Sequence, residues 1–175
     1  MRRTPRLIVY DRDTVVGAVV ELQPATLVVD VQPFVAPWGC SSDAMLSGVV
    51  ALAKYLADAA PNLRTLIFAT NARPAFRQQL QRGRPMVTLI GAAHKPWRVA
   101  YLTGAPRPVV VLGDQIITDG MLAFRVHGLF LHWRAPGHIP WWPRLQAMIG
   151  ALLIHFFFSP MRFCAPQATW RKSDQ

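Results

Sequence analysis

Acidic, basic and hydroxyl side chains follow the apolar segments of this sequence in a fixed order. In chain order, the residues are Asp30, Thr70 with Asn71, Lys95, Gly113 with Asp114, and Asp119. A carboxylate, a hydroxyl, an ammonium group and further acids together suit phosphoryl transfer to a carboxylate nucleophile, with a divalent metal offsetting the like charges of the acids and the phosphate. Each Asp taken singly is more often a helix cap or turn residue, so it is the order that predicts a site for phosphate chemistry.

The acids have distinct roles in such a site. Asp30 can attack phosphorus and give an aspartyl phosphate, and Asp30, Asp114 and a backbone carbonyl can hold Mg²⁺, which prefers hard oxygen ligands. Asp119, five residues after Asp114, can orient Lys95 or a metal-bound water. We therefore expect Asp30, Lys95 and Asp119 to be catalytic and Mg²⁺ to be the cofactor.

The remaining side chains suit the phosphate itself. Thr70, Asn71 and the backbone amides of the segment that follows can bind phosphate oxygens. Lys95 can neutralise the charge that develops on the transferring group and keep Asp30 ionised. We therefore expect Thr70, Asn71 and Lys95 to bind phosphate.

Short apolar runs rich in Val, Leu and Ile must position these residues. The runs are 25–29, 64–69, 86–90 and 109–112, followed by GLFLHW at 128–133. Buried strands that alternate with helices predict an α/β fold, a Rossmann-like doubly wound parallel sheet with helices on both faces. Ligands of such sheets bind at the carboxyl ends of the strands, near a switch in strand order, and the chemistry is expected there.

Four helices are predicted between and after these strands. The first begins at Ser41 or Ser42, either of which can cap it, shows apolar residues at helical spacing and ends before Pro61. The other three are expected at 71–83, 94–106 and 118–128, each closed at or near a glycine.

The composition fits one folded domain with a tail. The chain has 175 residues, of which 52% are hydrophobic, and a net charge of +10 that favours anionic partners. Its two cysteines are far apart and lack metal-like spacing, which argues against structural zinc and favours a reduced, cytoplasmic setting. Asp11, Arg12 and Asp13 interrupt the N-terminal apolar residues, so we expect no secretory signal.

The C-terminal segment, 135–175, is predicted to be a Pro/Gly linker and a basic, apolar helical tail after an α/β domain at 1–134. No charged side chain occurs between Arg144 and Arg162, and Trp141 and Trp142 stand at one end. An interfacial helix on an anionic bilayer, peripheral to the inner face of the membrane, fits this pattern. Packing on the domain or on a second subunit is an alternative, as is a membrane span, for which the stretch is borderline in length.

The motifs in this order resemble a known family. Asp30 at a strand end, FATNA, HKP and GDQIITDG, with Pro37-Trp38 in the first loop, are similar to the haloacid dehalogenase (HAD) superfamily, in particular to its capless phosphatases of the phosphatidylglycerophosphate phosphatase type. The resemblance covers roughly residues 25–126. It implies a Rossmann-like, Mg²⁺-dependent phosphomonoesterase whose substrate is a phosphorylated small molecule or a phospholipid.

The first motif departs from that family. Gln32 stands where the family has a second Asp, which protonates the leaving group and then activates water, and Phe34 stands where the family has Thr. An amide cannot exchange a proton near neutral pH, and loss of a positioned acid/base costs about 10²- to 10⁴-fold in rate. The backbone carbonyl of Gln32 can still be a metal ligand, so metal and phosphate binding can outlast turnover.

Three functional hypotheses follow from these residues. The first is a HAD-type phosphomonoester hydrolase, and the second is a catalytically weakened phosphate- and metal-binding or regulatory protein on the same fold. The third is a nucleic-acid-binding domain, but the basic residues Arg73, Arg77, Arg82 and Arg84 lack aromatic interleaving, which argues against it.

His127 and His132 have no carboxylate or Cys beside them, which argues against a metal site there. The sequence leaves the oligomeric state open.

Overall fold

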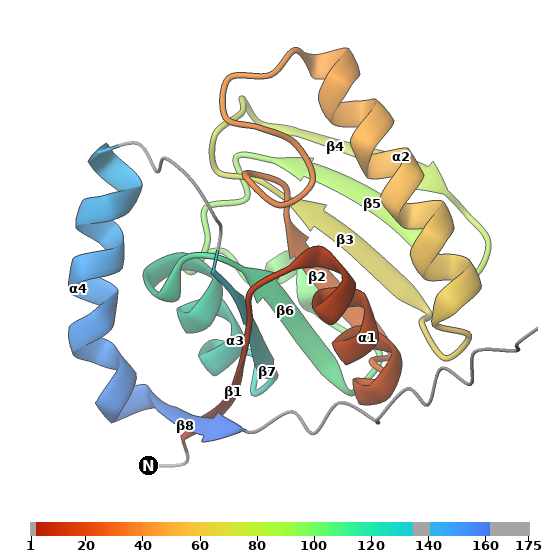
Figure 1. The fold of residues 1–175 in the computed structure, drawn as a ribbon. Helices are drawn as coiled ribbons and strands as arrows, with labels where there is room; N and C mark the ends of the chain where they lie inside the picture. Colours follow the sequence, from red (N-terminus) through yellow and green to blue (C-terminus); the bar gives the residue numbers. More distant parts are fainter. Residues whose placement is uncertain (1–2, 135–140, 162–175) are drawn as a thin grey trace, which may run out of the picture.

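The fold is built on one eight-stranded sheet. The computed structural model describes residues 3–134 and 141–161, and its strands have the order β4-β5-β3-β2-β6-β7-β1-β8 (Figure 1). The strands are β1 (Thr4–Val9), β2 (Thr26–Asp30), β3 (Thr65–Ala69), β4 (Phe76–Gln81), β5 (Met86–Gly91), β6 (Val109–Gly113), β7 (Leu129–Trp133) and β8 (Phe158–Met161). All neighbouring pairs are parallel except β4 and β5, which are antiparallel.

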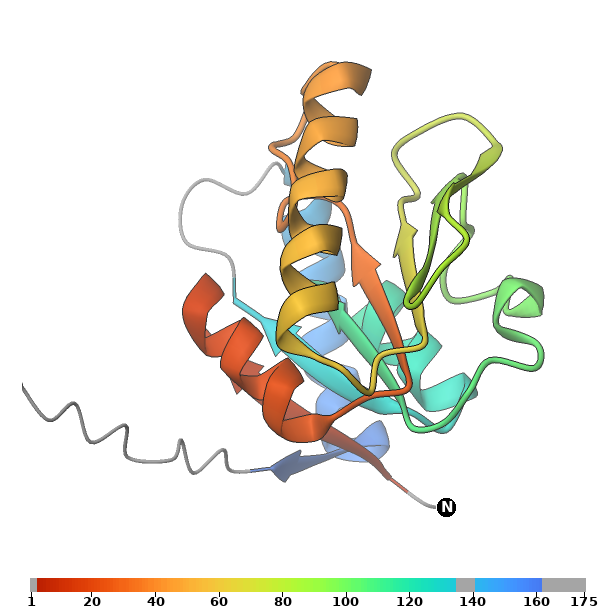
Figure 2. The same ribbon diagram turned by 90° about the vertical axis from the view of Figure 1, so that its right-hand side faces the viewer.

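Helices cover both faces of this sheet. They are α1 (Arg12–Leu22), α2 (Ser42–Ala59), α3 (Met121–Arg125) and α4 (Trp141–Phe157), with a 3₁₀ turn η1 (Ala100–Leu102) and a π turn η2 (Ile116–Gly120). Figure 2 shows α1 and α2 together on one side of the sheet. Buried residues of α3 and η2, and half-buried residues of α4, belong to the core on the opposite face.

Alternating side chains of each strand feed these two cores. In β2, Leu27 and Val29 belong to the core under α1 and α2, whereas Val28 belongs to the core under α3 and α4. Successive side chains of a strand point to opposite faces, and a strand buried on both faces is apolar throughout. The sequence prediction of an α/β fold with a mostly parallel sheet covered on both faces is therefore confirmed.

The five predicted strands and the first predicted helix are also confirmed. The strands correspond to β2, β3, β5, β6 and β7, with ends that differ by a residue or less. Helix α2 begins after Ser41, whose hydroxyl accepts a hydrogen bond from the Ala44 amide at 3.2 Å. This side chain satisfies a backbone donor that the first turn leaves free.

The helix predicted at 71–83 is wrong, because this segment contains strand β4. The side chains of Arg77, Gln78 and Gln79 are exposed, and of the residues in β4 only Phe76 and Leu80 pack against the core, where they are half-buried. Its backbone instead pairs with the free edge of β5, with an irregular register between Gln79 and Gln81. A charged, irregular edge strand also limits pairing with other chains.

The helices predicted at 94–106 and 118–128 are wrong in extent. The first region holds only the 3₁₀ turn η1, because its chain is drawn inward at Lys95, which is buried. The second begins as the π turn η2 and continues as the short helix α3, which ends at Arg125. Both departures occur where a charged residue is held inside the fold.

Three elements near the chain ends were not predicted. Strand β1 and helix α1 precede β2, and Asp11 caps α1 by accepting a hydrogen bond from the Thr14 amide at 2.7 Å. Strand β8, from the predicted tail, extends the sheet beside β1. Residues 135–140 and 162–175 of that segment lie outside the described residues.

Helix α4 packs on the domain along a narrow stripe. Gly150 is buried so close to Ile116 of η2 that an added Cβ would lie 2.9 Å from the Ile116 Cβ, and Phe157 meets Phe124 edge to face. The other side exposes apolar residues, namely Trp141, Leu145, Met148, Ile149, Leu152 and Phe156. Within 3–134 and 141–161, no helix combines the length and apolarity needed to cross a bilayer.

We predict that Gly150→Leu destabilises the protein by about 1 to 3 kcal/mol, because the added side chain overpacks the contact with Ile116. The matched variant Ala151→Leu places the same side chain on the exposed side of α4 and should stay within about 0.5 kcal/mol of the wild type. Urea denaturation measures both free energies of unfolding. Equal costs for the two variants would contradict this packing of α4.

Candidate functional site

The sequence-predicted residues meet at the carboxyl edge of the sheet. Asp30 ends β2, Thr70 follows β3, Lys95 lies in the loop after β5, and Asp114 follows β6. From β2 the chain adds β3 on one side, and it later returns to add β6 on the other side. The strand order therefore switches between β2 and β6, which is where open parallel sheets bind their ligands.

A buried lysine joins two of the acids. Lys95 Nζ lies 2.9 Å from Asp30 Oδ1 and 2.7 Å from Asp119 Oδ1. The side chains of Lys95 and Asp119 are almost fully enclosed, whereas that of Asp30 retains 11% exposure. The three residues expected to be catalytic are thus brought together, and only Asp30 of the three lines the adjoining pocket.

Asn71 holds the loop that carries Lys95. The Lys95 amide donates a hydrogen bond to Asn71 Oδ1 at 3.0 Å, and Asn71 Nδ2 donates to the Lys95 carbonyl at 3.2 Å. This reciprocal pair explains how a loop without a full helix can fix a lysine side chain. Asn71 also lines the pocket, so its predicted contact with phosphate is compatible with this role but untested.

The glycine of GDQIITDG makes room for Asp119. A Cβ on Gly113 would lie 2.2 Å from Asp119 Oδ2, a distance that no side chain can tolerate. The π turn η2 brings Asp119 back towards β6, and its Oδ2 accepts a hydrogen bond from the Gln115 amide at 3.3 Å. Asp119 can therefore pack against the end of β6 only because residue 113 is a glycine.

Asp114 supplies a third carboxylate. One oxygen each from Asp30, Asp114 and Asp119 can be chosen so that all lie within 4.8 Å of one another. Asp114 Oδ1 is buried and has no hydrogen-bond partner among the described residues, and the Asp114 carbonyl lies 3.2 Å from His132 Nε2. Hard oxygen donors at this spacing, one of them unsatisfied, fit a divalent cation such as Mg²⁺.

Burial and the neighbouring charges shift the pKa values of the ionisable groups in this site. Burial, and then the neighbouring Asp119 carboxylate, raise the pKa of Asp30 well above its usual range, and Lys95 opposes this shift. Burial followed by the Asp119 charge raises the pKa of Asp114 to about 7. The attraction of Asp119 and Asp30 outweighs burial at Lys95 and raises its pKa, so its ammonium stays charged.

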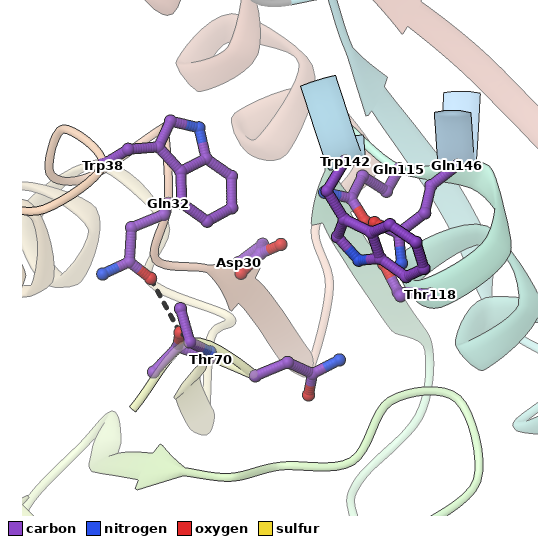
Figure 3. A pocket seen from close by; sticks show the side chains of 10 residues that line it. Asp30, Gln32, Trp38, Thr70, Gln115, Thr118, Trp142 and Gln146 are labelled. Atoms are coloured by element: carbon purple, nitrogen blue, oxygen red, sulfur yellow. Dashed lines mark hydrogen bonds between the residues drawn. The ribbon is translucent and has the colours of Figure 1, made fainter. Parts of the chain in front are cut away.

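Gln32, at the place of the missing acid, is bound to Thr70. Thr70 Oγ1 donates a hydrogen bond to Gln32 Oε1 at 2.7 Å, and both side chains are buried (Figure 3). Thr70 Oγ1 also accepts a hydrogen bond from the Ala72 amide at 3.0 Å. The Thr70 hydroxyl, which was predicted to bind phosphate, therefore already donates its hydrogen to the side-chain amide of Gln32.

A pocket of about 240 Å³ opens above these residues. Figure 3 shows Asp30 between Trp38 and Trp142, with Gln115, Thr118 and Gln146 beside Trp142. Apart from Asp30, these residues were given no role in a pocket by the sequence analysis. Trp38 and the Gln115–Thr118 segment were found as parts of motifs, whereas nothing in the sequence links α4 to the site.

Tyr101 is another residue that sequence reasoning missed. Its hydroxyl is buried and has no hydrogen-bond partner in the part of the chain that the structure describes, and the charges of Lys95, Asp119 and Asp30 influence its pKa. Burial is the main cause that raises the pKa of Tyr101 to about 12, so its phenol stays protonated at neutral pH.

Comparisons of this chain with models of protein families, with curated proteins and with solved structures find no significant match. The chemistry that these residues support is therefore inferred from their geometry and charge.

The raised pKa of Asp114 predicts a pH-dependent stability. A carboxyl whose pKa is about 7 in the folded state and about 3.9 in the unfolded state stabilises the fold fully below about pH 4 and loses that contribution as the pH rises to about 7. In chelator-treated protein, the free energy of unfolding of the wild type relative to Asp114→Asn should fall by roughly 1 kcal/mol per pH unit over this interval. Denaturation series that stay parallel from pH 4 to pH 7 would contradict the shift.

Proposed function

We propose that this chain is a HAD-type, Mg²⁺-dependent phosphomonoester hydrolase with Asp30 as the nucleophile. The supporting observation is the convergence of Asp30, Asp114, Asp119 and Lys95 at the switch point of the sheet, with one pocket-facing carboxylate. A carboxylate nucleophile, a fixed ammonium and an acidic cluster are what phosphoryl transfer through an aspartyl phosphate requires. The order of these residues along the chain also supports membership of that superfamily.

The donor set suits a bound Mg²⁺. Asp30 and Asp114 would hold the ion, and the Gln32 carbonyl is the expected third protein ligand. When bound, a divalent cation offsets the repulsion between the carboxylates and the phosphate and favours the ionised form of the acids. This effect opposes the burial that raises the pKa values of Asp30 and Asp114.

The side chains then divide the reaction between them. An oxygen of Asp30 attacks phosphorus, the bond from phosphorus to the alcohol oxygen breaks, and the alcohol leaves with a proton taken from water. Water then attacks the aspartyl phosphate, which releases inorganic phosphate and restores Asp30. Lys95, held by Asp119, places a fixed positive charge beside the reacting oxygen of Asp30.

The second candidate is a protein that binds phosphate and metal with negligible turnover. The hydrogen bond between Thr70 and Gln32 favours it, because it leaves an amide where proton transfer is needed. Among the described residues that line the pocket, only Asp30 is ionisable. Turnover by the first mechanism must therefore draw its proton from solvent, and it should be slow.

The substrate is proposed to be a phosphorylated small molecule or a phospholipid. The exposed apolar residues of α4 and the net charge of +10 support a substrate presented by an anionic membrane surface. A cytoplasmic protein that associates peripherally with the inner face of the membrane would combine these features.

We predict Mg²⁺-dependent phosphate release from phosphatidylglycerophosphate in vesicles or from soluble phosphomonoesters. The change Asp30→Asn should abolish release because the nucleophile is lost. The change Gln32→Asp should raise the rate by about 10²- to 10⁴-fold, because it restores a positioned acid/base. Phosphate release by the purified full chain measures all three proteins.

The outcomes separate the two candidates. Release by the wild type that is lost in Asp30→Asn supports the hydrolase, and unchanged release in that variant contradicts it. A silent wild type with an active Gln32→Asp variant supports the binding protein. If neither the wild type nor the Gln32→Asp variant releases phosphate from any of these substrates, the hydrolase is contradicted.

Mg²⁺ should raise the melting temperature of the wild type and should have a much smaller effect on Asp114→Asn, because that variant lacks a carboxylate ligand. Thermal unfolding with and without Mg²⁺ at pH 7.5 measures the difference. An exposed acid provides the control, since Asp58→Asn lies on the outer surface of α2 and should keep the wild-type response. Equal responses of Asp114→Asn and Asp58→Asn would place the ion elsewhere.

A further inference from the structure

Helix α4 forms part of the wall of the pocket that contains Asp30. Trp142 and Gln146 of its first two turns line the pocket. The topology explains this placement, because β7 ends at the carboxyl edge of the sheet and α4 leads back to β8, which runs parallel to β1 and hence to β7. The beginning of α4 must therefore lie at the edge that carries the site.

The same turn supports this wall and the catalytic acid. Gly150, one turn after Gln146, packs on Ile116 of η2, and Asp119 belongs to the same π turn. Helix α4, which carries Trp142, therefore packs through Gly150 on the same turn that carries Asp119. A wall held in this way can discriminate between substrates.

The lining of the pocket restricts what it can bind. Trp38 and Trp142 stand on opposite sides of Asp30 (Figure 3), and the other polar lining groups are neutral amides and hydroxyls. The nearby cation Lys95 is already held by two carboxylates. The pocket thus offers flat apolar surfaces and neutral hydrogen-bonding groups, and none of its lining residues within 3–134 and 141–161 is a cation that could bind a second anionic group.

The size of the pocket sets a second limit. Its volume of about 240 Å³ is smaller than the roughly 300–1,000 Å³ of pockets that enclose drug-sized ligands. A phosphate with one small ring or a short polyol therefore fits inside, and any larger group must extend out of the pocket.

We propose that Trp142, opposite Trp38, forms a leaving-group subsite that selects phosphomonoesters by the part of the leaving group nearest the phosphate, which lies inside the pocket and must be uncharged and no larger than one ring. The proposal rests on the proposed function, since it assumes that phosphate binds beside Asp30. Indole faces favour flat, apolar groups, and Gln146 adds a neutral amide to the same wall. Helix α4 thereby contributes to specificity through one wall of the pocket.

Calorimetric binding of phenyl phosphate and methyl phosphate to the full chain in Mg²⁺ tests this subsite. The wild type should bind phenyl phosphate about 10-fold more tightly than methyl phosphate, because its ring stacks on indole. Trp142→Ala should weaken the binding of phenyl phosphate far more than that of methyl phosphate and so reduce this ratio to about 1 or 2, and Trp142→Phe should keep most of it. The matched control Phe156→Ala removes an exposed aromatic ring from α4 away from the pocket and should behave as the wild type.

Several results would overturn the subsite. These are equal affinities of the wild type for the two ligands, an equal loss of both affinities in Trp142→Ala, and tighter binding of the anionic 2-phosphoglycolate than of phenyl phosphate. Phosphate release from phenyl phosphate, measured in parallel, separates this proposal from the hydrolase. Ring preference without release contradicts only the hydrolase, release without ring preference contradicts only the subsite, and a failure to bind any of these phosphates contradicts both.

Discussion

The ion pairs of one buried lysine constrain the rest of the structure. Lys95 comes from the loop after β5, Asp30 from the end of β2 and Asp119 from the turn after β6, so the three charges join both halves of the sheet across its switch point. Removal of one partner from a buried charge cluster leaves an uncompensated charge and costs about 3 to 5 kcal/mol. This arrangement requires three local structures, which are the two hydrogen bonds between Asn71 and Lys95, the glycine at position 113 and the π turn η2.

The site combines strong electrostatics with weak proton-transfer chemistry. Burial, and then repulsion by the Asp119 carboxylate, raises the pKa values of Asp30 and Asp114, and the positive charge of Lys95 opposes these shifts only in part. Gln32, by contrast, is buried and neutral, and its oxygen is occupied by the Thr70 hydroxyl. These features suit the proposed binding of metal and phosphate, and in the proposed hydrolase they would limit the rate of ester cleavage.

The sequence was sufficient for the central strands and for the composition of the site. Buried parallel strands are continuous apolar runs, and the residues that follow them must share one edge, so the meeting of Asp30, Lys95 and Asp114 could be predicted. The segment 71–83 could not be assigned correctly, because an exposed edge strand is defined by its pairing with β5 and shows no period of its own. Trp142 could not be placed at the site either, because its position depends on how α4 runs back from the carboxyl edge of the sheet to the start of β8.

The two sides of helix α4 have different surroundings. One side packs on η2 and lines the pocket, and the other exposes apolar side chains. Whether phosphate is received by Asp30 beneath this helix is tested most directly by a crystal structure with Mg²⁺ and beryllium fluoride, a mimic of a phosphoryl group on a carboxylate. We predict beryllium fluoride bonded to Asp30 and Mg²⁺ in contact with Asp30 and Asp114. A structure with neither group at this cluster, obtained at saturating concentrations of both, would contradict a metal-dependent phosphate site.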